Sequence, residues 1–148
     1  MKTVTTLTLL LTISTLFGCK SQSGEELFPG HMIQPAELAN MIQDGSASKI
    51  TLINVGPRKQ IPGAIKVGMV SEPEGMAAFK AELAKLPKDK EIVVYCGCCP
   101  YSHCPNVRPA AKLMAEMQFT NYKVLDLPSK FDNDWADKGY PVEKSAEQ

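Results

Sequence analysis

The sequence predicts an α/β domain with a central, mostly parallel sheet and helices on both faces. Two runs, residues 50–55 and 91–95, are continuous, apolar and β-branched, as in strands that are buried on both sides. Segments with apolar residues at helical spacing lie between such runs. Because strands and helices alternate along the chain, the strands are expected to pair in parallel.

The predicted elements fill one domain, residues 31–143. Prolines and glycines mark several boundaries: Pro35 can begin a helix, Pro87 stops one, and Gly139 can cap another. In chain order we expect an apolar start at 31–33, a helix at 35–43, a strand at 50–55, a turn that leads into a short strand at 61–67, a helix at 73–86, a strand at 91–95, a helix at 108–117, a strand at 122–127 and a short helix at 131–139.

The first 18 residues are typical of a secretory signal and not of the domain. Lys2 precedes a run of Leu, Thr, Ile and Phe that is too short to span a membrane as a helix. Leu16-Phe17-Gly18-Cys19 resembles a bacterial lipobox, in which the signal is cut before the cysteine and the cysteine carries the lipid. We therefore predict lipidation at Cys19; an ordinary signal with an incidental cysteine is the alternative.

The predicted mature chain would be exported and held at the cell envelope by lipid. Residues 19–30 are polar and contain Gly and Ser, which indicates a lipid-anchored tether, and residues 144–148 form a polar tail. Lys20 and Ser21 lack an acidic retention signal, so the outer membrane is preferred over the inner one. The chain has 16 basic and 16 acidic residues, and this balance predicts no nucleic-acid partner.

Four of the five cysteines lie in one loop between a strand and a helix. They are Cys96, Cys98, Cys99 and Cys104, and His103 lies beside the last. Ligand sites in parallel sheets lie beyond the carboxyl ends of the strands, which is where this loop begins. Cys96 directly follows the strand, so the sheet should hold it rigidly. The amides at the start of the next helix and the nearby Arg108 can stabilise a thiolate there.

Several separate stretches resemble the rhodanese-like family. The resemblance spans residues 31–143, and its stretches are LINV at 52–55, IPGAIKV at 61–67, IVVYC at 92–96, RPAAKLMAEMQF at 108–119 and VLDLPSKFDNDWADKGYPVE at 124–143. It implies a rhodanese fold and a sulfurtransferase that carries sulfane sulfur as a persulfide. By the same resemblance, Cys96 is the sulfur carrier and Arg108 closes the active-site loop.

The loop departs from the pattern of that family. Sulfurtransferases of the family usually place the arginine five residues after the cysteine, and the related phosphatases place it six after, whereas Arg108 comes 12 residues after Cys96. The loop is therefore interpreted as containing an insertion of about seven residues. The family's Asp-Val-Arg reads Asn54-Val55-Gly56, with Arg58 slightly later. Arg58 and His103 are candidates for lining the pocket.

The additional cysteines leave three hypotheses open. Cys98 or Cys99 could form a disulfide with Cys104 and brace the loop, as an oxidising compartment permits. Cys96 and Cys99 form a CxxC that could exchange disulfides or release a persulfide. In the third hypothesis the metal ligands of a Cu or Zn site are Cys96, Cys98, Cys99, His103 and Cys104.

The first hypothesis for the protein as a whole is an enzyme. Cys96 would take sulfur from thiosulfate or a persulfide and pass it to a thiol or a protein acceptor, and no cofactor is expected. The alternatives are an envelope thiol-disulfide redox module that uses Cys96 and Cys99, and a binding module that holds a soft metal.

Overall fold

The computed structural model describes residues 28–58 and 60–143. The predicted signal, the lipidation site at Cys19, most of the predicted tether and the polar tail lie outside the described residues. Within the described part of the chain, no helix is long and apolar enough to cross a membrane.

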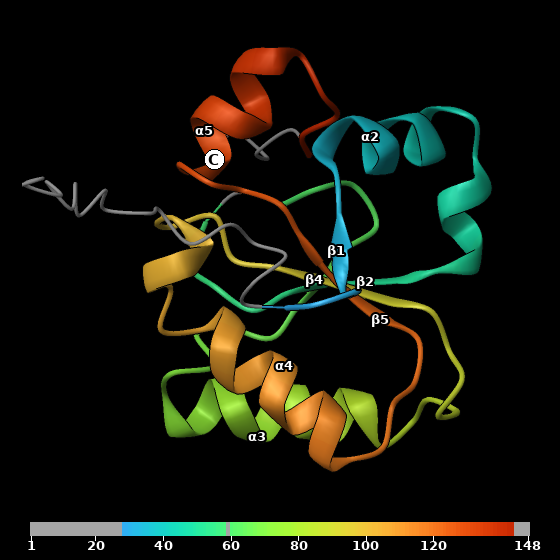
Figure 1. Cartoon of the computed structure of the whole chain (residues 1–148), viewed down its shortest axis with the longest axis vertical. Helices are drawn as coiled ribbons and strands as arrows, with labels where there is room; N and C mark the ends of the chain where they lie inside the picture. The colour runs from blue at the N-terminus through green and yellow to red at the C-terminus, as the bar shows by residue number, and fades with distance from the viewer. Residues whose placement is uncertain (1–27, 59, 144–148) are drawn as a thin grey trace, which may run out of the picture.

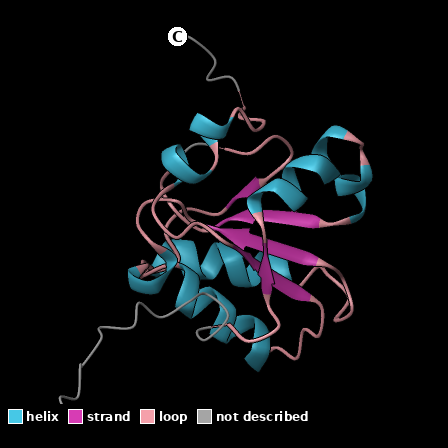
Figure 2. Cartoon of the chain, turned by 45° about the horizontal axis from the view of Figure 1, so that its top comes forward, coloured by secondary structure: helices cyan, strands magenta, loops and turns pink. Residues whose placement is uncertain are grey.

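A five-stranded, fully parallel sheet forms the centre of the molecule (Figures 1 and 2). Its strand order is β1-β5-β4-β2-β3, so β4 lies in the middle. The strands are β1 (Met32–Ile33), β2 (Thr51–Asn54), β3 (Ile65–Lys66), β4 (Ile92–Tyr95) and β5 (Tyr122–Leu125).

Helices cover both faces of the sheet, with α3 and α4 on one side and α2 and α5 on the other (Figure 1). The α-helices are α2 (Pro35–Gln43), α3 (Pro73–Leu83), α4 (Val107–Glu116) and α5 (Phe131–Asp134), and 3-10 turns occur at η1 (Ser46–Lys49), η2 (Tyr101–His103) and η3 (Ala136–Lys138). The predicted α/β class with helices on both faces is confirmed.

The alternation of side chains along β4 determines on which face of the sheet Cys96 lies. Ile92 and Val94 belong to the core shared with α3 and α4, whereas Val93 and Tyr95 belong to the core shared with α2 and α5. Successive side chains of a strand point to opposite faces. The next residue, Cys96, therefore belongs to the core on the side of α4.

The structure agrees with the sequence prediction at residues 61–67 and differs from it at the start of the domain. The Pro62-Gly63 turn leads into the short strand Ile65–Lys66. Phe28, which the prediction assigned to the tether, is only 7% exposed and packs into the core beside α4. The folded part of the chain therefore includes residues before the predicted boundary at 31.

Candidate active site

Cys96 lies at the carboxyl edge of the sheet, directly after the central strand β4. Its side chain is 1% exposed. Gly56, which follows β2, lies so close that a Cβ at this position would overlap the Cys96 sulfur. The absence of a side chain at Gly56 therefore provides the space that the Cys96 thiol occupies. Sequence reasoning noted Gly56 only as a departure from the family pattern.

The loop brings the sulfur atoms of Cys96, Cys98 and Cys104 together. The Sγ atoms of Cys96, Cys98 and Cys104 all lie within 4.8 Å of one another. The Cys96 and Cys98 sulfurs are 3.1 Å apart, and the Cys98 and Cys99 sulfurs are 3.2 Å apart. All four cysteines are free thiols in the structure. We call these four residues the thiol cluster.

Cys104 is the thiol that carries the negative charge most readily. A hydrogen bond from the Cys96 thiol is the largest cause that lowers the pKa of Cys104 to about 5. Burial opposes this shift, while the backbone N–H groups of Asn106 and Val107 support it. These N–H groups belong to the beginning of α4, where amides without a helical partner favour an anion.

Two other thiols of the cluster, those of Cys96 and Cys99, have raised pKa values. Donation of the Cys96 hydrogen bond to Cys104, together with burial, raises the pKa of Cys96 far above its usual range. Burial is also the largest cause that raises the pKa of Cys99 to about 12. The opposite directions of the Cys96 and Cys104 pKa shifts favour the negative charge on Cys104 rather than on Cys96. Cys98 and Cys99 are half-buried and form the more accessible part of the cluster.

Asn106, which directly precedes α4, contacts the Cys96 sulfur. Its side chain is 2% exposed, and its Nδ2 donates to the Cys96 sulfur at 3.4 Å. Its Oδ1 accepts a hydrogen bond from the Ser71 backbone N–H at 2.9 Å. Sequence reasoning missed this residue, because its side chain does not cap α4 and its partners are distant in the sequence.

His103 and Arg58, the predicted pocket residues, are exposed and bonded to other groups than the sulfurs. His103 is exposed, and its Nδ1 lies 2.9 Å from the Ser102 hydroxyl. Arg58 is also exposed, and its carbonyl accepts a hydrogen bond from the Asn54 side chain. The role of both residues in a substrate pocket stays a prediction.

Arg108 lies on the outer face of α4. It is exposed and lines an open hollow together with Phe28, His31 and Tyr122. Helical periodicity explains this placement, because Val107 is the residue of the first turn that packs into the core. The inserted loop has thus brought Cys104 and Asn106, rather than Arg108, next to Cys96. The predicted loop-closing role of Arg108 stays a prediction.

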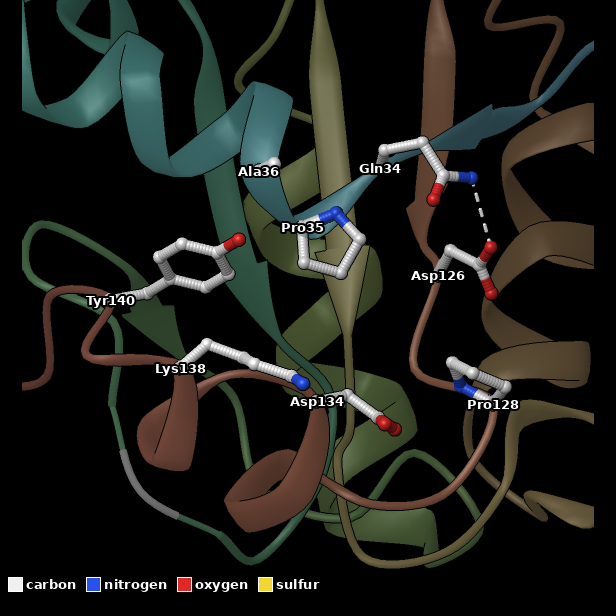
Figure 3. A pocket seen from close by; sticks show the side chains of 8 residues that line it. All are labelled: Gln34, Pro35, Ala36, Asp126, Pro128, Asp134, Lys138 and Tyr140. Carbon is white, nitrogen blue, oxygen red and sulfur yellow. Dashed lines mark hydrogen bonds between the residues drawn. The ribbon is translucent and has the colours of Figure 1, made fainter.

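A second hollow of about 280 Å³ lies at the same edge of the sheet, on the side of α2 and α5 (Figure 3). Its polar residues include Asp126, whose Oδ2 accepts a hydrogen bond from Gln34, whereas its buried Oδ1 has no partner among the described residues. The residues that line it are Gln34, Pro35, Ala36, Asp126, Pro128, Asp134, Lys138 and Tyr140. This set contains no cysteine, so the thiol chemistry is located elsewhere.

The family comparison agrees with the architecture. The model of the rhodanese-like domain matches residues 34–127, which is more than half of the chain. The chain therefore belongs to the rhodanese-like family. Comparison with curated proteins gives no significant match.

Solved structures of other proteins share this fold. The Alr3790 protein from Anabaena sp. aligns with a TM-score of 0.56 and 18% identity, over 78% of this chain and 94% of that one. A Rhodopseudomonas palustris protein described as a possible tyrosine phosphatase, RPA3614, aligns with a TM-score of 0.55 and 17% identity, over 92% and 100% of the two chains. A variant of EanB in complex with hercynine aligns with a TM-score of 0.51 and 17% identity, over 77% of this chain but 27% of that one.

Proposed function

We propose that this protein is a sulfurtransferase that carries sulfane sulfur as a persulfide on Cys96. The observation that carries the proposal is the buried Cys96 thiol at the carboxyl end of β4, with the sulfurs of Cys98 and Cys104 within 4.8 Å of it. Cys96 occupies the position after the central strand at which the family holds its reactive cysteine. Cys104 provides a neighbouring thiolate that can accept a proton from it.

In the first half of the reaction, Cys96 takes sulfur from a donor such as thiosulfate. The Cys96 sulfur attacks the outer sulfur of thiosulfate, a new S–S bond forms, and sulfite leaves with the electron pair of the broken S–S bond. The Cys104 thiolate accepts the proton of the Cys96 thiol as the attack proceeds. The Asn106 side chain donates to the Sγ of Cys96, so it holds the inner sulfur of the persulfide and stabilises the thiolate that leaves when the outer sulfur is passed on.

In the second half, a thiol acceptor removes the sulfur. The acceptor thiolate attacks the outer sulfur of the persulfide, and the Cys96 thiolate leaves and recovers its proton from Cys104. Because Cys96 is buried and Cys98 and Cys99 are half-buried, the acceptor would approach along the side of these two thiols. The sulfur of Cys98 lies 3.1 Å from that of Cys96, so it lines the last part of this path.

An assay of sulfur transfer tests this proposal. Reduced protein should transfer sulfur from thiosulfate to cyanide or to a small thiol, and Cys96→Ser should reduce the rate at least about 100-fold, because the covalent intermediate is lost. Cys104→Ser should lower the rate less, since it removes only the internal base. Retention of wild-type activity by Cys96→Ser would refute Cys96 as the carrier.

A second candidate function is thiol-disulfide exchange, which the short sulfur–sulfur distances favour. The closest pair that includes Cys96 is Cys96 with Cys98, whereas the predicted CxxC partner, Cys99, lies next to Cys98. Quantitative alkylation after incubation with a disulfide or dithiol buffer would test it. A redox function requires a pair that equilibrates reversibly with the buffer, and the absence of such a pair would exclude it.

We also propose that the chain is exported and anchored to the cell envelope by a lipid on Cys19. The lipobox-like Leu16-Phe17-Gly18-Cys19 and the preceding apolar run support this proposal. Expression in a bacterium with radiolabelled fatty acid should label the wild-type chain and leave Cys19→Ser unlabelled. Equal labelling of both would disprove anchoring at Cys19.

A further inference from the structure

The sulfur atoms of Cys96, Cys98 and Cys104 form a three-membered group with the size of a metal site. All three lie within 4.8 Å of one another, and one pair is 3.1 Å apart. A metal at the centre of three thiolates, with metal–sulfur distances of about 2.3 Å, needs sulfur–sulfur separations of roughly 4 Å. The Cys96–Cys98 separation is shorter than this value and no pair exceeds 4.8 Å, so the three sulfurs are close to the spacing that such a site needs.

The donors in this group are sulfur atoms alone. His103, which the sequence placed among the possible ligands, is exposed and lies beside the Ser102 hydroxyl. Cys99 adjoins Cys98 but is not a member of the group. Soft thiolate ligands select Cu(I), Zn or iron–sulfur clusters among biological metals. Structural zinc almost always takes four protein ligands, whereas Cu(I) is stable with three.

The surroundings of the three sulfurs resemble the outer shell of a metal centre. Asn106 donates to the Cys96 sulfur, and the Asn106 and Val107 backbone N–H groups donate to Cys104. Hydrogen bonds of this kind orient ligands and tune metal affinity. Cys96 and Cys104 are each 1% exposed and are held by β4 and by the start of α4, respectively. Cys98 is half-buried and leaves a route by which an ion can enter.

We infer that Cys96, Cys98 and Cys104 form a binding site for one Cu(I) ion in trigonal thiolate coordination. The site goes beyond sulfur transfer and does not depend on it, because it needs only the reduced thiols. Binding replaces thiol protons by the metal, and no electron is exchanged when copper enters as Cu(I). A bound ion would occupy Cys96, so the metal-loaded protein should be inactive in sulfur transfer.

Competition with a coloured chelator tests the site. Full-length protein, reduced and kept anaerobic, is titrated into a Cu(I)–bicinchoninate solution, and the loss of colour reports metal transfer. One equivalent of Cu(I) should transfer per chain, and X-ray absorption should show sulfur as the ligand atom. Cys98→Ser and Cys104→Ser should each weaken binding at least about tenfold, because a metal–thiolate bond is lost.

Two control variants distinguish this three-sulfur site from a metal site that also uses Cys99 or His103. Cys99→Ser and His103→Ala should bind Cu(I) as the wild type does, since both residues lie outside the three-sulfur group. Cys98→Ser alters a half-buried position, so it keeps the test valid if the buried Cys104→Ser does not fold.

Failure to remove copper from the chelator would overturn the inference, and so would equal weakening by Cys99→Ser or His103→Ala. Thiosulfate transfer by the metal-free protein is measured on the same samples. If the wild-type protein transfers sulfur but does not bind copper, the metal site alone is rejected. If it binds copper but does not transfer sulfur, the sulfurtransferase proposal alone is rejected.

Discussion

At the scale of single residues, the site depends on how buried polar groups are paired. Asn106 is one of two buried polar residues among those described, and its side chain links the Ser71 backbone to the Cys96 sulfur. The hydrogen bond to the partly buried Ser71 N–H contributes modestly to stability, because water can replace part of it when the acceptor is lost. Asn106 thus has both a structural contact and a contact with the reactive sulfur.

Asn106→Ala should lower the free energy of unfolding by about 0.5–1.5 kcal/mol, since it removes the hydrogen bond to the partly buried Ser71 N–H. It should also slow sulfur transfer more than this loss of folded protein explains, because the Cys96 sulfur loses a donor. Urea denaturation and the thiosulfate assay measure the two effects. Asn133→Ala is the control, because Asn133 is exposed and should change stability by less than about 0.5 kcal/mol. Equal effects of the two variants would contradict this role of Asn106.

At the scale of elements, the inserted loop is held by contacts with the C-terminal segment. Gly97 has a φ of +74°, and its carbonyl accepts a hydrogen bond from the Phe131 N–H at 3.1 Å. Phe131 stacks on Tyr95 of β4 and on Trp135. The aromatic residues of the closing segment therefore fix the point at which the loop leaves the sheet.

Gly97→Ala should destabilise the protein more than Gly63→Ala does. Both glycines have positive φ, which costs another residue about 1–2 kcal/mol. A Cβ at Gly97 would also overlap the Phe131 side chain, whereas a Cβ at Gly63 meets no atom within 4 Å. We expect an additional loss of at least about 1 kcal/mol for Gly97→Ala in urea denaturation. Equal losses for the two variants would show that the Gly97–Phe131 contact does not restrain the loop.

At the scale of the whole molecule, the thiol cluster couples folding to pH. Cys104 has a folded pKa of about 5, below the value of 9.0 for an ordinary cysteine. A lowered pKa means that the unfolded chain binds more protons between these two values. The stabilising effect of the Cys104 thiolate is therefore fully present above about pH 9 and is lost as the pH falls toward 5. Cys96 and Cys99 have raised pKa values, so their stabilising effect is lost above pH 9.

The free energy of unfolding of the reduced protein should consequently rise between pH 5 and pH 9 relative to that of Cys104→Ser. The slope from this single group is limited to about 1.4 kcal/mol per pH unit. Urea denaturation of both proteins at several pH values gives the difference directly, because carboxylates and histidines contribute equally to both. A difference that is independent of pH would show that Cys104 is not an anion in the folded protein.

The sequence was sufficient to predict the architecture and the position of the thiol cluster. It was not sufficient to predict which residues of the cluster contact one another. Continuous apolar runs determine parallel strands, and Cys96 follows the central one, so both could be predicted. The neighbours of Cys96 depend on how an inserted loop packs, and spacing alone does not reveal this. Asn106 and Gly56 became visible only through their contacts, and the helical phase of α4 directs Arg108 outward.

The central claim, a persulfide on Cys96, is tested most directly by mapping sulfur on the protein itself. The reduced chain is incubated with thiosulfate, unreacted thiols and persulfides are alkylated, and peptides are sequenced by mass spectrometry. The account predicts one additional sulfur atom on Cys96, and none anywhere in the Cys96→Ser protein. The extra sulfur on Cys98, Cys99 or Cys104 of the wild type, or its persistence in Cys96→Ser, would contradict the account.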